Sequence, residues 1–462
     1  MKNVYLKKLI FLYFNRFKLL TAILSVTVLF VNLSYAQNWE ALGLGTNNNV
    51  NAMVVFNGEL VVGGDFTSTG GIGTNRIARW NGSSWQALGL GLNGPVYALA
   101  VFNGELIVAG GFSQVGGIPA SRIAKWNGSN WMLLGTNAAV NNDILALAVF
   151  NNILYAAGRF TAIGGSTMNR VAMWNGSSWV SLGLGLNEHA HALAVYGGEL
   201  AVCGNFTSAG GISANRIAKW NGSSWSNLGL GLNSDAFALA VIGSDLYVGG
   251  TFTAVGGVGV NRIAKWNGSW SALGTGTNSN VFSLANSSGQ LIAGGDFTTA
   301  GGIGANRIAR WNGTSWSALG SGMTGNDPVQ VLAVANYGGV PYAGGDFNNA
   351  GGIIVNNIAR WGTPTGISII SSEVPGSFRL YQNYPNPFNP STKIRFDITK
   401  SSDVKLRIYD AVGSDVMLLV NETMQPGTHE VYFDAAGISS GVYYYELITG
   451  DYRESKKMIL AK

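Results

Sequence analysis

The stretch Asn75-Arg76-Ile77-Ala78-Arg79-Trp80-Asn81-Gly82-Ser83-Ser84-Trp85-Gln86-Ala87-Leu88-Gly89 decides the fold, because versions of it return along most of the chain. Its first Trp returns at spacings of 45 to 50 residues, and a second Trp follows in every copy but the last. The first position is held by Trp80, Trp126, Trp174, Trp220, Trp266, Trp311 and Trp361, and the second by Trp85, Trp131, Trp179, Trp225, Trp270 and Trp316. A repeat of this length is typical of an array or a propeller.

The two ends of this array complete one another. Trp361 has no second Trp after it, whereas Asn38-Trp39-Glu40-Ala41-Leu42-Gly43 is a second half without a first half. An open array gains nothing from such an offset, but in a ring the N-terminal strand completes the last sheet. The 14 Trp residues then form seven pairs. We therefore predict an all-β chain with a seven-bladed β-propeller over residues 37–361, closed by its N-terminal strand.

Each repeat predicts four strands. In the second repeat these are Val96 to Phe102, Glu105 to Phe112, Arg122 to Trp126 and Trp131 to Gly135. Asn-Gly between apolar runs is a strong hairpin signal, because both residues accept positive φ. The short loop between the two Trp of a repeat places their indoles opposite one another on one face of a hairpin.

Features that recur in every repeat are best explained by packing. We expect the Trp pairs to pack between blades, and the Arg that opens each third strand to donate to neighbouring carbonyls. The single Cys203 stands where other repeats have Gly or Ala, so we expect a small buried residue.

The first 36 residues predict a cleaved secretory signal peptide, with Gln37 as the mature N-terminus. Five basic residues without any acid accompany an apolar run from Leu19 to Val31, and Ser34-Tyr35-Ala36 places small residues where a signal peptidase reads. An uncleaved membrane anchor is the alternative, but the apolar run is short for a span. The formal charge of +5 lies wholly in this segment, so the remaining chain is neutral. This neutrality argues against nucleic-acid binding, and we expect no membrane span after cleavage.

The repeats resemble known propellers. The Gly-Gly pair that closes the second strand, as in Gly63-Gly64 and Gly249-Gly250, is similar to kelch-type and galactose-oxidase-type repeats. The fuller pattern of Ile-Ala-Arg-Trp-Asn-Gly, a second Trp, Leu-Gly and Gly-Gly-Asp-Phe resembles the repeats of fungal cortical polarity markers and many bacterial surface proteins. The Cys-Tyr crosslink and two His of the galactose oxidase copper site have no counterpart in this sequence.

After Trp361 the composition changes. Residues 362–378 predict a linker rich in Gly, Ser, Thr and Pro, and residues 379–462 predict six short strands in an antiparallel, immunoglobulin-like sandwich. The expected strands run over Lys393 to Ile398, Val404 to Tyr409, Val416 to Val420, Glu430 to Phe433, Val442 to Ile448 and Arg453 to Leu460.

This tail resembles the type A C-terminal sorting domain of the type IX secretion system of Gram-negative bacteria. The resemblance rests on Tyr384-Pro385-Asn386-Pro387, Ile408-Tyr409-Asp410-Ala411-Val412-Gly413, Gly441-Val442-Tyr443-Tyr444-Tyr445 and Lys456-Lys457-Met458-Ile459-Leu460. It implies contact with the type IX machinery, passage through the outer membrane, and a secreted or cell-surface location. The related domain of flagellar hook-capping proteins is the alternative.

Positions where the repeats differ are the candidate binding site, because packing keeps blades alike whereas ligand contacts differ between them. The residues before the Ala-Leu-Ala-Val core of each first strand are expected at the mouth of the central channel. They are Asn51, Tyr97, Leu145, His191, Phe237, Phe282 and Gln330, preceded two positions earlier by Asn49, Pro95, Asp143, His189, Asp235, Asn280 and Pro328. A third variable position follows the Gly pair at Asp65, Gly111, Arg159, Asn205, Thr251, Asp296 and Asp346. The competing explanation is that these positions vary only because they lie in loops where neither packing nor binding restricts the residue.

No catalytic motif is visible, so we predict a binding or adhesion module without enzymatic activity, cofactor or metal site. His189 and His191 lie two apart beside Glu188, but two ligands do not make a metal site. His429 stands alone in the tail and is expected to be solvated. The ligand is expected to be a glycan or another surface protein.

Two alternatives remain open. One is an extracellular polysaccharide-active enzyme at the channel mouth, which requires converging carboxylates, or a His with a Tyr or Arg, on one face. Asp143, His189, His191 and Asp235 around one pocket would favour it. The other is a structural surface component without a specific ligand.

Overall fold

The computed structural model describes residues 38–461 except residues 83, 137, 327, 363–366, 372, 436–437 and 451. The expected signal peptide and the expected mature terminus at Gln37 lie outside these residues. All regular structure in the described part is β, which confirms the predicted fold class. No described segment forms a helix with the length and apolar character of a membrane span.

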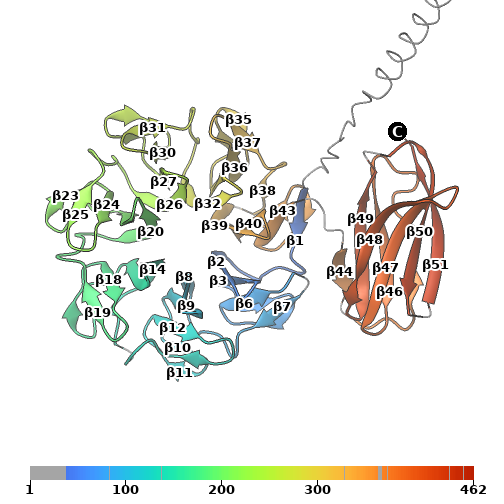
Figure 1. Cartoon of the computed structure of the whole chain (residues 1–462), viewed down its shortest axis with the longest axis horizontal. Helices are drawn as coiled ribbons and strands as arrows, with labels where there is room; N and C mark the ends of the chain where they lie inside the picture. The colour runs from blue at the N-terminus through green and yellow to red at the C-terminus, as the bar shows by residue number, and fades with distance from the viewer. Residues whose placement is uncertain are drawn as a thin grey trace, which may run out of the picture.

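Four-stranded antiparallel sheets form a ring, with seven such sheets among the residues described before Gly362 (Figure 1). Each sheet is a blade, and we number the blades 1 to 7 by their inner strands. The inner strands are β2 Val50–Phe56, β8 Val96–Phe102, β14 Ile144–Phe150, β20 Ala190–Tyr196, β26 Ala236–Ile242, β32 Val281–Ser287 and β39 Gln330–Tyr337. Each inner strand contacts the inner strands of both neighbouring blades, and β39 contacts β2. The ring is therefore closed around a central axis.

The remaining strands of each blade follow outward. The second strands are β3 Glu59–Gly64, β9 Glu105–Gly110, β15 Ile153–Gly158, β21 Glu199–Gly204, β27 Asp245–Gly250, β33 Gln290–Gly295 and β40 Val340–Asp346. The third strands are β6 Ile77–Trp80, β12 Ile123–Trp126, β18 Val171–Trp174, β24 Ile217–Trp220, β30 Ile263–Trp266, β36 Ile308–Trp311 and β43 Ile358–Gly362. The outer strands are β7 Trp85–Ala87, β13 Trp131–Met132, β19 Trp179–Ser181, β25 Trp225–Asn227, β31 Trp270–Ala272, β37 Trp316–Ala318 and β1 Asn38–Ala41.

The N-terminal strand β1 closes the ring as the outer strand of blade 7. It pairs antiparallel with β43, and Trp39 lies opposite Trp361. The two indoles are 5.3 Å apart. Trp39 Nε1 also donates to the carbonyl of Leu319 at 2.8 Å. The two ends of the propeller are thus joined by the pairing that the leftover half-repeats predict.

The Trp pairs hold each blade to the one before it. The paired indoles lie 5.1 to 5.6 Å apart in every blade. In six of the blades the Nε1 of the second Trp donates to the carbonyl of the Leu that follows the preceding outer strand, as in Trp85 to Leu42 at 2.7 Å and Trp316 to Leu273 at 2.8 Å. Most of these indoles are buried. The faces of these indoles pack against protein between the blades, so they are not available for stacking on an external sugar.

Residue volumes are matched across the blade boundaries. A Cβ added to Gly63, Gly249 or Gly344 would lie 2.4 to 2.6 Å from a Val methyl group of the next inner strand. The equivalent Cys203, which is fully buried, instead shares a core cluster with the smaller Ala236. The small buried residue expected at this position is therefore present, and burial raises the pKa of its thiol.

A two-stranded hairpin joins the second and third strands, where the sequence predicted only a loop around two Gly. These hairpins are β4 Ser68–Thr69 with β5 Ile72–Gly73, β10 Gln114–Val115 with β11 Ile118–Pro119, β16 Ala162–Ile163 with β17 Ser166–Thr167, β22 Ser208–Ala209 with β23 Ile212–Ser213, β28 Ala254–Val255 with β29 Val258–Gly259, β34 Thr299–Ala300 with β35 Ile303–Gly304, and β41 Asn349–Ala350 with β42 Ile353–Ile354, which β38 Met323–Thr324 extends. Asn47 stabilises the first hairpin, because its Oδ1 accepts hydrogen bonds from the backbone N–H groups of Thr67 and Ser68 at 2.8 and 3.0 Å.

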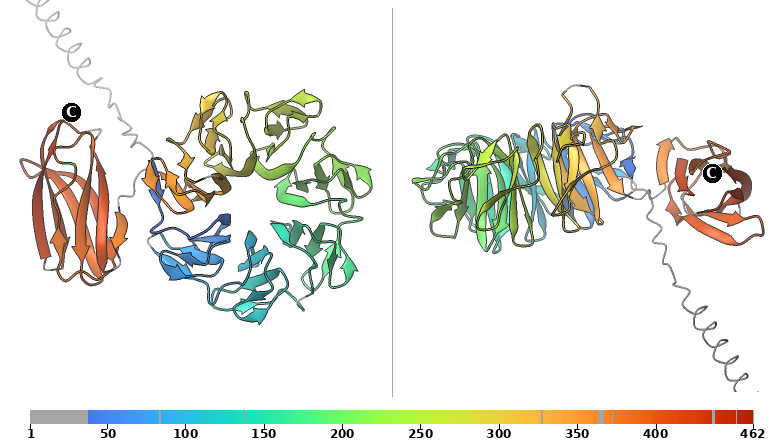
Figure 2. Two further views of the ribbon diagram at one scale, coloured as in Figure 1. Left: turned by 180° about the vertical axis from the view of Figure 1, so that it is seen from behind. Right: turned by 90° about the horizontal axis from the view of Figure 1, so that it is seen from above.

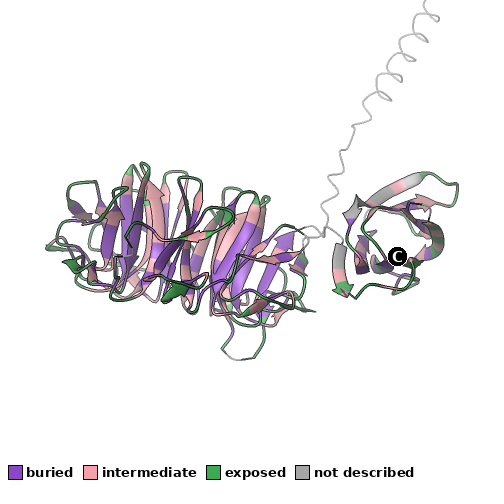
Figure 3. Cartoon of the chain, turned by 90° about the horizontal axis from the view of Figure 1, so that it is seen from below, coloured by how far each residue is buried: buried purple, intermediate pink, exposed green. Residues whose placement is uncertain are grey.

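The views in Figures 2 and 3 show the ring as a thick disc, with buried strands between two faces of exposed loops. The inner strands begin at one face, where the second strands end. We call this face the mouth face. It also carries the connections between blades and the small hairpins.

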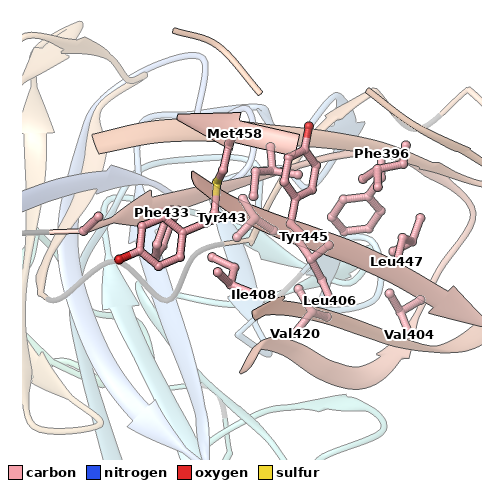
Figure 4. Packing of buried hydrophobic residues seen from close by; sticks show 14 of the residues in the cluster. Phe396, Val404, Leu406, Ile408, Val420, Phe433, Tyr443, Tyr445, Leu447 and Met458 are labelled. Carbon is pink, nitrogen blue, oxygen red and sulfur yellow. The ribbon is translucent and has the colours of Figure 1, made fainter. Parts of the chain in front are cut away.

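The C-terminal part is a two-sheet sandwich around one core. One sheet has the order β44 Ile367–Ser371, β49 Gly427–Asp434, β46 Ser391–Ile398, β45 Arg379–Leu380; the other has β48 Asp415–Met424, β47 Ser402–Asp410, β50 Gly441–Thr449, β51 Tyr452–Leu460. Figure 4 shows Phe396, Leu406, Tyr445 and Met458 filling the space between the sheets. The core cluster here contains no propeller residue.

Two expectations for the tail are wrong. Residues 367–371 were expected in a linker but form β44, which pairs antiparallel with β49 at the edge of its sheet. His429 was expected to be solvated but is buried, with its ring stacked on Phe396 at 5.6 Å. Its Nε2 donates to the carbonyl of Gln425 at 3.0 Å, and burial lowers the pKa of the imidazole.

Candidate functional site

A β-bulge sits at the start of every inner strand and sets the geometry of the mouth. In blade 1, Val50 pairs with Gly64 and Ala52 with Gly63, so Asn51 is the extra residue. A bulge re-aims a side chain out of the regular alternation, and here it is repeated around the axis. We call the bulged residues the mouth ring: Asn51, Tyr97, Leu145, His191, Phe237, Phe282 and Leu332. All of them are half-buried.

The structure corrects one member of this ring. In blade 7, Val331 pairs with Gly345 and Ala333 with Gly344, so Leu332 is the bulged residue. The predicted Gln330 lies two positions earlier, opposite Asp346, in the place that His189 and Asp235 hold in their blades. Pro328, which was expected there, lies on an exposed loop instead. The shift arose because Val331-Leu332-Ala333-Val334 imitates the Ala-Leu-Ala-Val core of the other repeats.

The residues that follow the second strands stand directly behind the mouth ring. Asn51 donates to Oδ2 of Asp65 at 3.1 Å, and His191 Nε2 is hydrogen-bonded to Oδ1 of Asn205. Asn280 donates to Oδ2 of Asp296 at 3.0 Å. The three variable positions that were expected at the mouth therefore do come together.

Three aromatic side chains of consecutive blades form an arc on one side of the ring. His191 meets Phe237 edge to face at 5.2 Å between centroids, and Phe237 meets Phe282 at 5.7 Å. Burial lowers the pKa of His191, so its imidazole is neutral at neutral pH. We call these residues the aromatic arc.

Carboxylates in the middle blades are neutralised by arginines. Asp143 lies 3.4 Å from Arg159, and Asp235 lies 3.3 Å from Arg216 of the preceding blade. Glu188 lies 3.1 Å from His189 and 3.8 Å from Arg170. The arginines also donate to carbonyls, as expected of structural donors: Arg122 reaches the carbonyl of Val140 at 2.7 Å.

The carboxylates of blades 6, 7 and 1 have a different environment. Asp296, Asp346 and Asp65 take the same position in these consecutive blades, and none forms an ion pair with another described residue. Blade 7 has Asn357 where the other blades have Arg, which leaves no guanidinium at that place. Burial raises the pKa of Asp346. We call these three residues the acidic arc.

Tyr97 lies between the charged groups of neighbouring blades. Burial, together with the carboxylates of Asp143 and Asp65, raises the pKa of its phenol. The hydroxyl therefore stays protonated at neutral pH and can both donate and accept a hydrogen bond.

The arrangement does not gather a catalytic or metal-binding constellation. Within the described ranges, no group of three or more His, Cys, Asp or Glu side chains is placed to hold a metal ion. Asp143 and Asp235 each pair with an arginine, and His189 pairs with Glu188.

A surface pocket of about 230 Å³ lies away from the mouth, between blades 2 and 3. Its lining includes Phe102, Lys125, Leu134 and Trp174. At this boundary Ala109 shares a core cluster with the larger Ile144, whereas Ala157 at the next boundary shares one with Ala190. The pocket thus coincides with a boundary of unusually large paired residues.

Family models match both parts of the chain. Residues 382–461 match a secretion system C-terminal sorting domain. Residues 28–195 match the Rax2 C-terminal beta propeller domain, and residues 287–313 match a beta-propeller domain of unknown function. No curated protein matches the chain in sequence.

Solved structures with a similar outline are distant. One is PorZ of Porphyromonas gingivalis, a surface component of its type IX secretion system, with 13% identity and a TM-score of 0.40; the match covers 90% of this chain and 60% of PorZ. Another is an acylaminoacyl peptidase of Pyrococcus horikoshii, with 9% identity and a TM-score of 0.41, covering 78% of this chain and 60% of the peptidase. The chain thus spans about 60% of the length of each.

The family matches confirm the resemblance drawn from the repeats and from the tail motifs. The sorting domain indicates export to the cell surface or to the outside of the cell. The chain therefore joins a β-propeller with Rax2-like repeats to a type IX C-terminal sorting domain.

Proposed function

We propose that the protein is an extracellular binding module without enzymatic activity, and that its ligand is a glycan bound across the aromatic arc and the acidic arc. One observation carries the proposal: the mouth has aromatic side chains in blades 4 to 6 and carboxylates without an ion pair in blades 6, 7 and 1, although packing makes the rest of the blades alike. A half-buried aromatic arc offers flat surfaces for the C–H face of a sugar ring, while unpaired carboxylates accept hydrogen bonds from its hydroxyl groups.

The edges of the two arcs meet in blade 6. There Phe282 belongs to the ring and Asp296 stands behind it, held by Asn280 at 3.0 Å. A sugar stacked on Phe282 therefore has a fixed carboxylate within the same blade. A glycan whose exposed residues carry a free amine gains a further contact, because the carboxylates of Asp296 and Asp346 form no ion pair with a described residue.

The test is binding of the chain from Gln37 to Lys462 to a glycan array and to intact cells. The variant pairs Phe237→Ala with Phe282→Ala, and Asp296→Asn with Asp346→Asn, each should lose at least 10-fold in affinity while keeping the wild-type melting curve. Leu145→Ala is the matched control, because Leu145 holds the same bulge position outside both arcs, and it should bind normally.

Other outcomes decide between the alternatives. Binding to cells but to no glycan, lost in the same variants, would assign a surface protein as ligand. Turnover of a polysaccharide that disappears with Asp143→Asn or Asp235→Asn would replace the proposal by an enzyme. No signal from any probe would favour a structural surface component.

A further inference from the structure

Four leucines stand exposed on equivalent loops of the mouth face. Each lies in a Gly-Leu-Gly turn that connects the outer strand of one blade with the inner strand of the next. We call them the rim leucines: Leu44, Leu90, Leu184 and Leu230, whose exposed fractions are 61%, 71%, 71% and 73%. Large apolar side chains that are repeatedly exposed on one face mark an interaction surface.

The loop itself does not require leucine. The carbonyl of Leu90 accepts from Asn75 Nδ2 at 3.0 Å, and the same bond joins Asn261 to Thr275 at 2.8 Å and Asn306 to Ser321 at 2.9 Å. The flanking Gly residues have positive φ in all of these loops, for instance 69° at Gly91 and 70° at Gly276. Because Thr and Ser fill the same rigid turn elsewhere, the four leucines are not explained by folding.

A second apolar residue accompanies each rim leucine. It begins the second strand of the neighbouring small hairpin, and a Cβ added to the adjacent Gly117 would lie 3.8 Å from Leu90 Cδ1. These residues are Ile72, Ile118, Ile212 and Val258, all 39 to 44% exposed. Ile303 and Ile353 hold the same position beside Thr275 and Ser321 and are 42% and 39% exposed, so the leucines and not the hairpin residues distinguish the loops. The boundary between blades 2 and 3 has neither of these apolar residues. Its loop lacks the leucine, and the second strand of its hairpin begins with the exposed Ser166.

The order of these loops around the ring has a two-fold symmetry. From the boundary of blades 7 and 1 onward, the positions carry Leu44, Leu90, no leucine, Leu184, Leu230, Thr275 and Ser321. A line through the boundary of blades 2 and 3 relates Leu90 to Leu184 and Leu44 to Leu230. It also relates Thr275 to Ser321. The hairpin residues follow the same line, which relates Ile118 to Ile212, Ile72 to Val258 and Ile353 to Ile303, with the polar Ser166 on the line itself. The exposed Ile354 has no apolar counterpart, because Gly304 stands at the related place.

We infer that the mouth face pairs with the mouth face of a second copy of this chain. A two-fold axis perpendicular to the ring axis turns one disc onto the other and superposes the circle of loops on itself. When that axis runs through the boundary of blades 2 and 3, Leu90 of one copy faces Leu184 of the other, and Leu44 faces Leu230. Every leucine then meets a leucine, and the polar loops meet one another.

A second copy fits this surface better than a lipid bilayer does. The rim leucines are separate tips, and polar side chains such as Asn93 and Asn233 lie exposed between them. A bilayer would have to cover these amides, whereas an identical ring offers tips and gaps at the same spacing. The leucine loops also carry no Lys or Arg, which removes the usual attraction to anionic lipid.

The inference is tested by sedimentation velocity of the chain from Gln37 to Lys462 between 1 and 100 μM. We expect a reversible dimer, and we expect Leu44→Thr, Leu90→Thr, Leu184→Thr and Leu230→Thr combined to be monomeric with an unchanged melting curve. The control combines Val55→Thr, Val101→Thr and Val195→Thr, three exposed residues near the opposite ends of inner strands, and should dimerise normally.

Crosslinking tests the symmetry. A short bis-maleimide should join Leu90→Cys to Leu184→Cys when the two variants are mixed, but should join neither to itself; Cys203 is buried and does not interfere. A monomeric wild type, or equal crosslinking of each variant alone, would overturn the proposal. Binding of the monomer to phosphatidylcholine vesicles through the leucines would assign the face to lipid instead. The rim leucines and the arcs lie on the same face, so pairing of two copies and binding of a glycan compete for it. The two proposals stay distinguishable, because the arc variants should still dimerise while the quadruple Leu→Thr variant should bind the glycan at least as tightly as the wild type.

Discussion

At the scale of single residues, the blades are fitted together by complementary volumes. A methyl group added at Gly249 would lie 2.5 Å from Cγ1 of Val281, too close for any side chain. We expect Gly249→Ala to lower the free energy of unfolding by about 1–3 kcal/mol, as overpacking of a rigid core does. Urea unfolding followed by Trp fluorescence measures this.

The paired variant separates volume from other effects. Gly249→Ala with Val281→Ala recreates the combination found naturally at Ala157 and Ala190. Its destabilisation should be smaller than the sum of the single variants by roughly 1 kcal/mol or more. Simple additivity of the two changes would show that the blade boundary relaxes around the extra methyl group.

His429 makes the sorting domain sensitive to mild acid. Its pKa is lowered from 6.5 by burial, so the folded state prefers the neutral imidazole while the unfolded chain takes up a proton more readily. The stability from this preference is fully present above pH 6.5 and is lost as the pH falls toward the folded pKa. His429→Phe should therefore lose less stability than wild type between pH 7.5 and 5.5, measured by thermal melts of the sorting domain. Identical losses in both proteins would rule out His429 as the cause.

The mouth residues could be assigned from the sequence where the repeats align clearly. The assignment failed in blade 7, where a neighbouring segment imitates the Ala-Leu-Ala-Val core. One Gly near the end of each second strand lies opposite the residue before the bulge in every blade, so alignment on Gly345 would have identified Leu332 instead of Gln330. The acidic arc was harder to find. Asp65, Asp296 and Asp346 are visible as variable residues, but their lack of a paired cation depends on where the arginines of neighbouring blades reach.

At the scale of elements, β1 is a four-residue strand on which the whole ring depends. It contributes the pairing with β43, the Trp39–Trp361 contact and the ion pair of Glu40 with Arg360 Nε at 2.7 Å. Deletion of residues 38–43 should lower the melting temperature of the propeller by many degrees, because β43 becomes an open edge and Trp361 is uncovered. Differential scanning calorimetry measures the change.

A point variant distinguishes strand loss from loss of one bond. Trp39→Phe keeps the strand and most of the aromatic contact but removes the hydrogen bond to Leu319, so it should cost only about 1 kcal/mol. An unchanged melt after the full deletion would refute closure by β1.

The elements that the sequence predicted well are those with local signals. The inner strand Val96–Phe102 was predicted to the residue, because apolar runs end at Asn-Gly turns. The small hairpins were missed because each strand has two residues, and what fixes them is a side chain such as Asn47, distant in sequence from Thr67. Strand β44 was missed for a similar reason, since only its pairing with β49 distinguishes it from a linker.

At the scale of the whole molecule, the chain consists of two parts with separate cores. No buried cluster in the described residues combines propeller and sandwich side chains. The last propeller strand ends at Gly362 and the first sandwich strand begins at Ile367. The sandwich therefore begins by Ile367, inside the linker that composition predicted over residues 362–378, and this determines how the chain should be cut.

Three truncations follow from this division. A chain that ends at Gly362 should keep the melting curve of the propeller and fail to reach the cell surface, because it lacks the sorting domain; surface display of this chain would contradict the sorting assignment.

For the tail alone, a fragment from Ile367 to Lys462 should be more stable than one from Arg379, since only the longer fragment covers the open edge of β49 with β44. The comparison is made by urea unfolding at equal concentration. If both fragments unfold at the same urea concentration, β44 adds nothing to the sandwich, and residues 367–371 act as the connector that their composition indicated.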